Sequence, residues 1–142
     1  MTQKRSILVV DDESSVREAI RMILKPKYEV YTAADGQEAI QCIQKEKIDI
    51  VTLDLKMPGL SGIDVLKKIK QHNMDIEVVV ISGYGTPQNL QEATRQGAGD
   101  FITKPFHAPD LINSICKSLE RRTYNLRLKN LARYNASVVI SE

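Results

Sequence analysis

The sequence predicts an α/β fold, a single domain in which helices cover both faces of a mostly parallel sheet. Strand-like and helix-like segments alternate along the chain, and parallel strands need connections long enough to hold a helix. Three strand-like segments are continuously apolar, as expected of central strands that are buried on both faces. The 142 residues are 42% hydrophobic and 27% charged, which are the proportions of one ordinary globular domain.

The first half of the chain contains three strand–helix units. Residues 6–10 and 49–53 are apolar runs, whereas residues 28–33 alternate and suit an edge strand. A helix is predicted after each strand, because apolar residues there recur at helical spacing. The three apolar faces consist of Val16, Ile20, Ile23 and Leu24, of Ala39, Ile40 and Ile43, and of Ile63, Val65, Leu66 and Ile69.

The second half adds two more units. Residues 77–81 form the most apolar run, and residues 100–103 form a shorter, more polar strand that suits the other edge. A weaker helix spans about residues 87–96 between them. Asp110 is the predicted cap of a long final helix that runs through Tyr134.

Several classes of protein do not fit the composition. The longest apolar runs, residues 7–10 and 78–81, have four residues each, whereas a membrane-spanning helix needs about 20. Such a run is also too short for a secretory signal, so we expect a cytoplasmic protein with no membrane partner. Cys42 and Cys116 lie 74 positions apart in helix-like patterns. They predict buried or half-buried core residues and neither a disulfide framework nor a metal site.

Polar and charged residues follow the predicted strands where each strand ends. Asp11 and Asp12 follow the first strand, Asp54 the third, Ser82 the fourth and Lys104 the fifth. Taken singly, the aspartates have an ordinary explanation as helix or turn caps, and the lysine as a surface residue. Ligands of open α/β sheets bind outside the carboxyl ends of the strands, so the joint placement of these residues predicts a site.

Three clustered carboxylates predict a cation. Two unit charges about 4 Å apart interact by roughly 4 kcal/mol at an effective dielectric of about 20, so the cluster cannot stay fully ionised unaided. Oxygen ligands suit Mg²⁺, which keeps part of its water shell and commonly bridges carboxylate and phosphate. With the charge screened by the metal and Lys104, one carboxylate can attack phosphorus and form an acyl phosphate. Ser82 can then donate a hydrogen bond to the phosphoryl group.

Asp54 is the predicted nucleophile, because it ends a central strand and precedes a sharp turn. Residues 56–62 of this turn contain Pro58, Gly59 and Gly62. Proline and glycine allow the backbone to reverse direction and to point groups at the site. The backbone carbonyl of Lys56 is the predicted additional ligand of the metal.

Together these motifs resemble the receiver domain of two-component response regulators. The resemblance rests on residues 7–13, on residues 54–59 with Gly62, and on the segments 82–83 and 104–106, all in the family's order. It covers residues 4–120 and leaves residues 121–142 as a C-terminal helical extension or linker. It implies a flavodoxin-like, doubly wound (βα)₅ sheet of order 2-1-3-4-5. The chain is then either a stand-alone receiver or the front part of a longer regulator.

The resemblance implies that the chain is a signalling phosphoacceptor rather than a classical enzyme. Asp54 would accept a phosphoryl group from a sensor histidine kinase or a phosphotransfer protein, and the domain would promote its own phosphotransfer and dephosphorylation. Asp11, Asp12, Asp54 and the Lys56 carbonyl would hold Mg²⁺, with Mn²⁺ as an alternative. These four residues form the implied metal site.

The resemblance also implies a conformational switch. Ser82 and Lys104 would contact the phosphoryl group, and Ser82 would act with Phe101, which occupies the family's switch position three residues before the lysine. Phe101 lacks a hydroxyl, and its alternative explanation is an ordinary core residue of an edge strand. Lys56 and Tyr84 occupy variable positions of the family that tune the lifetime of the acyl phosphate.

The C-terminal part is basic. Residues 117–134 carry six basic residues and one acidic residue. A basic tail can bind nucleic acid, but these charges alternate with leucines at helical spacing, so we predict a solvated helix face and no direct nucleic-acid binding. Leu126, Leu128 and Leu131 lie beyond what five strands can cover. They predict a weak homodimer through this helix and the adjacent strand–helix face of residues 87–119, although the spacing does not give three clean heptads.

Three other functions fit the motifs less well. An aspartyl phosphatase of the haloacid dehalogenase type needs a second acid two residues after its nucleophile, where this chain has Lys56. A nucleotide-binding module would carry GxGxxG or GxxxxGK[ST], and neither motif occurs. A receiver-like scaffold that works without phosphorylation would be expected to lack Asp12, Asp54 or Lys104, and all three are present.

Overall fold

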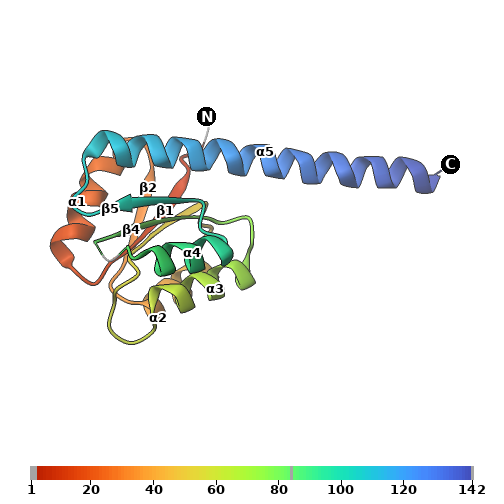
Figure 1. Cartoon of the computed structure of the whole chain (residues 1–142). Coiled ribbons are helices and arrows are strands. Elements are labelled where there is room, and N and C mark those ends of the chain that lie inside the picture. Colours follow the sequence, from red (N-terminus) through yellow and green to blue (C-terminus); the bar gives the residue numbers. More distant parts are fainter. Residues whose placement is uncertain (1–2, 84, 142) are drawn as a thin grey trace.

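The structure is a computed structural model that describes residues 3–83 and 85–141. Within these residues, a five-stranded parallel sheet has the order β2-β1-β3-β4-β5 (Figure 1). The strands are β1 (Ser6–Val10), β2 (Glu29–Ala33), β3 (Ile50–Leu53), β4 (Glu77–Ser82) and β5 (Asp100–Thr103). The predicted fold class, the strand order and the two edge strands are therefore confirmed.

The helices of the described chain form one layer on each face of the sheet. They are α1 (Ser14–Leu24), α2 (Gly36–Lys45), α3 (Gly62–His72), α4 (Pro87–Arg95) and α5 (Ala108–Ser141). Helices α1 and α5 pack on one face, and α2, α3 and α4 pack on the other (Figure 1). This two-sided cover is what the alternation of strands and helices predicted.

Alternate residues of the central strands enter the two layers. Leu8 and Val10 of β1 pack with α2 and α3, whereas Ile7 and Val9 pack with α1 and α5. All four side chains are at most 1% exposed. Burial on both faces explains why these strands are continuously apolar, and the parallel pairs bring their carboxyl ends to one end of the sheet.

The final helix begins earlier and ends later than predicted. The carbonyl of His107 already accepts hydrogen bonds from the backbone N–H groups of Asp110 and Leu111, so α5 begins at Ala108. Asp110 therefore lies in the first turn of the helix, where a negative charge interacts favourably with the helix dipole. The prediction that Asp110 caps the helix is wrong. The helix continues past its predicted end to Ser141.

Only the first part of α5 covers the sheet. Leu111 and Ile115 are fully buried, whereas Leu128 and Leu131 are 48% and 56% exposed. The remainder of the helix projects beyond the body of the domain (Figure 1). Although α5 is long, no helix in the described part of the chain is apolar enough to cross a membrane.

Three basic residues of α5 form ion pairs at the amino end of the sheet, where the strands begin. The pairs, with their nitrogen–oxygen distances, are Arg121–Glu77 (2.5 Å), Arg122–Asp49 (3.2 Å) and Lys129–Asp75 (2.5 Å). The prediction of a solvated basic face is wrong for Arg122, whose side chain is 12% exposed, whereas the side chains of Arg121 and Lys129 remain 40% and 42% exposed although they are paired. The linear pattern could not show the pairing, because the acidic partners lie far away in the sequence, just before β3 and at or just before the start of β4.

Candidate functional site

Residues from four strand ends meet at the carboxyl end of the sheet. Asp11 directly follows β1, Asp54 follows β3, Ser82 is the last residue of β4, and Lys104 follows β5. Asp11 and Lys104 are in direct contact although they lie 93 positions apart in the sequence. The fold therefore brings together the side chains that the strand ends predicted.

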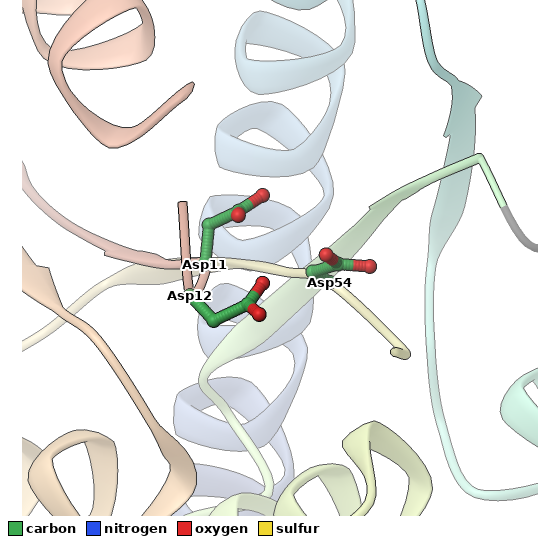
Figure 2. A group of neighbouring side chains, drawn as sticks. All are labelled: Asp11, Asp12 and Asp54. Atoms are coloured by element: carbon green, nitrogen blue, oxygen red, sulfur yellow. The ribbon is translucent and has the colours of Figure 1, made fainter. Parts of the chain in front are cut away.

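Asp11, Asp12 and Asp54 form a cluster of carboxylates (Figure 2). One oxygen atom of each residue lies within 4.8 Å of the others. Asp11 and Asp54 are only 2% and 6% exposed, whereas Asp12 is exposed. Their mutual repulsion is strongest where water is excluded, so the cluster favours a bound cation.

Lys104 supplies one positive charge to this cluster. Its Nζ donates hydrogen bonds to Asp11 Oδ2 at 2.6 Å and to Asp54 Oδ2 at 3.1 Å. Burial lowers the pKa of Lys104, but the two carboxylates together outweigh burial and raise the pKa above its ordinary value. One ammonium cannot balance three carboxylates, so the cluster keeps an excess of negative charge.

Both carboxylate oxygens of Asp54 accept hydrogen bonds. Oδ1 accepts from the Ser82 hydroxyl at 3.0 Å and from the backbone N–H of Lys56 at 3.1 Å, while Oδ2 accepts from Lys104. These donors hold the carboxylate in one orientation. Lys56 thus contacts Asp54 through its N–H, and the use of its carbonyl as a metal ligand stays a prediction.

The turn after Asp54 depends on two glycines. Gly59 has a φ of +82°, a left-handed conformation that favours glycine. Gly62 is the first residue of α3, and a Cβ atom there would lie 2.7 Å from the carbonyl oxygen of Asp54. The hydroxyl of Ser61 caps the helix by accepting a hydrogen bond from the N–H of Asp64. The helix can therefore start directly against the backbone that carries the Asp54 carboxylate.

A cavity of about 350 Å³ opens over the cluster. Its lining residues are Asp12, Glu13, Asp54, Lys56, Ser82, Gly83 and Lys104. Asp11 lies deeper and does not line the cavity. Glu13 also lines the cavity. The only signal in the sequence that could have pointed to it is its position directly after the two aspartates.

Asp11 and Asp12 do not cap α1. The cap position is occupied by Glu13, and no capping hydrogen bond from a side chain is formed there. Asp11 Oδ1 instead accepts a hydrogen bond from the backbone N–H of Glu13 at 2.9 Å, and its carbonyl accepts one from Arg17 at 2.7 Å. The ordinary explanation of the two aspartates as caps is therefore wrong.

Phe101 lies apart from the cavity. It pairs with Val80 across β4 and β5, is half-buried, and packs against the core on the side of α2, α3 and α4. This position agrees with an ordinary core residue, and the switch role of Phe101 stays a prediction. Tyr84, at the second variable position, lies outside the described residues.

The donor atoms fit a hard divalent cation. All three side chains in the cluster offer carboxylate oxygens, and none is a histidine or cysteine. Mg²⁺ takes oxygen ligands and keeps several waters, for which the open cavity leaves room. Zinc sites, by contrast, are dominated by nitrogen and sulfur ligands.

Comparisons with known sequences agree with this geometry. The family model of the response regulator receiver domain matches residues 7–116. The chain is 34% identical over 114 residues to sporulation initiation phosphotransferase F of Bacillus subtilis, a match that covers 80% of this chain and 92% of that protein. It is 42% identical over 120 residues to response regulator RR06 of Streptococcus pneumoniae, covering 84% of this chain and 54% of that protein.

Comparisons with solved structures give the same result. A CheY-like receiver domain protein from Methanospirillum hungatei has a TM-score of 0.84 and 27% identity, covering 87% of this chain and 99% of that one. NtrX from Brucella abortus has a TM-score of 0.86 and 36% identity, covering 91% of this chain but 30% of that one. The chain thus spans nearly all of some relatives and about half or less of others.

Proposed function

This chain belongs to the family of response regulator receiver domains, the phosphoacceptor modules of two-component signal transduction, and on that basis we propose that Asp54 is its site of phosphorylation. The observation that carries this proposal is a carboxylate that faces an open cavity while Ser82 and Lys104 contact its two oxygens. Asp11 lies beneath the cavity and does not line it. Of the two buried carboxylates in the cluster, Asp54 is therefore the one that faces the cavity.

The proposed reaction transfers a phosphoryl group from a phosphohistidine of the partner. An oxygen of Asp54 attacks phosphorus, an O–P bond forms, the N–P bond breaks, and its electron pair returns to the imidazole nitrogen. Such transfers depend on positioning and on charge stabilisation rather than on further covalent chemistry. The N–H of Lys56 and the hydroxyl of Ser82 position the carboxylate for this attack.

The acidic cluster is the proposed metal site. Asp11, Asp12, Asp54 and the carbonyl of Lys56 would hold Mg²⁺, with Mn²⁺ as an alternative. When bound, the cation supplies positive charge that lets a carboxylate approach a phosphoryl group. Lys104 adds a second positive charge, because its Nζ already contacts Oδ2 of Asp54.

Ser82 and Lys104 are proposed to convert phosphorylation into a change of conformation. Both side chains now contact Asp54, and a phosphoryl group on Asp54 would offer each a new partner. The ends of β4 and β5 would then shift together with Phe101, which lies on β5. Hydrolysis of the acyl phosphate by the domain itself would reverse the change, with Lys56 and Tyr84 setting its rate.

A groove beside the cavity is the proposed docking surface for the phosphodonor. Its volume is about 510 Å³, and its lining is mostly apolar: Ser15, Val16, Ala19, Ile23, Lys104, Pro105 and Phe106. Lys104 lines both the groove and the cavity. A helix of a sensor histidine kinase or phosphotransfer protein seated there would bring its phosphohistidine next to Asp54.

The projecting part of α5 is proposed to form a weak homodimer. Leu119 packs against the core, and Leu126 lines a cavity at the amino end of the sheet. Leu128, Leu131 and Asn135 are exposed and follow the spacing of heptad positions a, d and a. Asparagine at an a position specifies register and oligomeric state in coiled coils, so these residues favour a two-stranded pairing with a second copy.

Phosphorylation of Asp54 is tested by incubating the full chain with a small phosphodonor and Mg²⁺ and measuring its intact mass. We expect one phosphoryl group on the wild type, none without a divalent cation, and none on Asp54→Asn. Asp75→Asn, which removes a carboxylate at the amino end of the sheet, serves as the matched control and should be labelled normally. Labelling of Asp54→Asn at the wild-type rate would refute the assignment.

The coupling role of Lys104 is tested with Lys104→Ala. This variant should still be phosphorylated, but amide resonances of residues 82–83 and 85–104 should no longer shift on phosphorylation, because the ammonium that links β5 to the phosphoryl group is absent. Lys129→Ala removes an ammonium at the other end of the sheet. Its amide resonances should shift on phosphorylation as those of the wild type do. A full set of shifts in Lys104→Ala would contradict the coupling role.

The dimer is tested by sedimentation of the full chain with and without phosphorylation. We expect concentration-dependent dimers that Leu128→Asp abolishes, because a charge in an apolar seam cannot be paired. Asn130→Asp adds the same charge outside the seam and should dimerise like the wild type. A wild-type chain that is monomeric at every concentration and in both states would leave α5 as a linker.

A further inference from the structure

A cavity of about 750 Å³ lies at the opposite end of the molecule from Asp54. It is bounded by residues 3–5 at the start of the chain, by residues 27–28 before β2, and by the part of α5 between residues 119 and 127. Its volume is in the range of clefts that bind small molecules. Phosphorylation of Asp54 makes no use of it.

The charge around this cavity is strongly positive. Four basic side chains and one acidic side chain line it: Lys4, Arg5, Lys27, Arg127 and Glu120. Within the described residues, none of these four cations forms an ion pair with a carboxylate. Like charges that converge on a concave surface create a positive potential that attracts anions.

Neighbouring cations of α5 behave differently. Arg121, Arg122 and Lys129 each have a carboxylate partner in the body of the domain. Arg127 belongs to the same stretch of helix but lines the cavity together with Lys27. Within the described residues, the acidic residues at the amino end of the sheet therefore form ion pairs with one set of cations and not with the other.

The remaining lining residues of the cavity are two tyrosines and a leucine, together with the polar Gln3 and Thr123. Tyr28 is 7% exposed, and Tyr124 is 63% exposed, so much of the Tyr124 residue is accessible from solvent. Leu119 adds an aliphatic wall. An exposed aromatic ring beside cations is the combination that binds a planar base and its phosphates.

We propose that this cavity binds a nucleoside diphosphate or triphosphate. The phosphates contact Lys4, Arg5, Lys27 and Arg127, because arginine and lysine are the residues that best bind phosphate oxygens. The base stacks on the ring of Tyr124. The phosphates are held by side chains rather than by a glycine-rich loop, so the site needs neither of the nucleotide-binding motifs that the sequence lacks.

The test is calorimetric titration of ATP into the full chain in buffer that contains EDTA. EDTA removes divalent cations, so the acidic cluster around Asp54 cannot take up phosphate through a metal. We expect saturable binding that weakens with salt, because several charge contacts contribute. Asp54→Asn should bind ATP like the wild type, so this result and the phosphorylation of Asp54 are judged separately.

Variants distinguish the site from general electrostatic attraction. Lys27→Gln and Arg127→Gln should each weaken binding by about tenfold, the effect of losing one charged hydrogen bond. Tyr124→Ala should weaken it severalfold, whereas Tyr124→Phe should retain it. Arg133→Gln removes an exposed positive charge of α5 outside the cavity and should bind like the wild type.

Four results would overturn the proposal. The first is no saturation at millimolar ATP, and the second is an equal loss of affinity in Arg133→Gln. The third is inorganic triphosphate binding as tightly as ATP, which would mean that the base is not recognised. The fourth is a single-stranded oligonucleotide binding more tightly than ATP through the same residues, which would identify a nucleic-acid surface instead.

Discussion

Two groups of three acidic residues, one at each end of the sheet, differ in how their charges are balanced. At the carboxyl end, Asp11, Asp12 and Asp54 share the single ammonium of Lys104. At the amino end, three carboxylates each have their own cation from α5: Asp49 pairs with Arg122, Asp75 with Lys129 and Glu77 with Arg121. The negative charge of the group at the carboxyl end is thus only partly compensated, whereas the negative charge of the group at the amino end is neutralised.

This difference distinguishes a cluster that can bind a cation from a cluster that stabilises the fold. An undercompensated cluster that opens to a cavity gains by binding a cation and can then act on a phosphoryl group. A neutralised cluster has no such drive, and its contacts instead hold α5 against the body of the domain. Acidic residues at strand ends are therefore informative only when their counterions are known.

The largest effect on stability is expected from Arg122→Ala. The Arg122 and Asp49 side chains are only 12% and 9% exposed, so removal of the arginine leaves a nearly buried carboxylate without its cation. Breaking a buried pair in this way costs about 3–5 kcal/mol of unfolding free energy. Urea denaturation measures the loss, and Arg133→Ala, an exposed residue of the same helix, should change stability by less than about 0.5 kcal/mol. Equal effects of the two variants would show that the pair does not hold α5.

Binding of Mg²⁺ is expected to stabilise the domain through the carboxyl end alone. At a concentration 100 times the dissociation constant, a ligand that binds only the folded state adds about 2.7 kcal/mol. Urea denaturation with Mg²⁺ and with EDTA should show this gain for the wild type and for Asp75→Asn, and a much smaller one for Asp54→Asn. A gain that survives in Asp54→Asn would place the cation elsewhere.

Without a metal, loss of one carboxylate should have opposite effects at the two ends. Asp12→Asn relieves repulsion within the cluster and should raise the unfolding free energy in EDTA by about 0.5 kcal/mol, the scale of exposed charge pairs. Asp75→Asn removes an ion pair and should lower it by a similar amount. The same sign for both variants would contradict the assignment of one cluster as undercompensated.

The smallest effect concerns pH. Since the pKa of Lys104 is raised in the folded state, its contribution to stability is complete below its ordinary pKa of 10.5 and is lost as the pH rises through the higher folded pKa. The pair of Arg122 with Asp49 lies at the other end of the sheet and does not involve Lys104. Amide spectra recorded in EDTA between pH 9 and pH 12 should change first near Asp11 and Asp54. Spectral changes that begin at a lower pH near Asp49 than near Asp11 and Asp54 would contradict this prediction.

The residues at the strand ends could be predicted because local patterns determine them. Asp11, Asp54, Ser82 and Lys104 follow segments whose apolar character identifies them as strands, and a parallel sheet gathers such ends at one place. The contacts of Asp54 with the N–H of Lys56 and with both Ser82 and Lys104 required the tertiary structure. The sequence shows which groups assemble, but not which oxygen each group contacts.

The final helix shows most clearly what the sequence alone left undecided. Helical spacing predicted a long helix, yet Leu119, Leu126, Leu128 and Leu131 read as one irregular apolar series. In the fold they belong to two stripes, one toward the body and one toward solvent. The sequence also did not show which cations of the helix are paired. Their carboxylate partners lie in distant segments that only the packing of the sheet brings next to the helix. Local periodicity determines that a helix forms, whereas long-range packing decides which of its faces is buried, paired or free to bind.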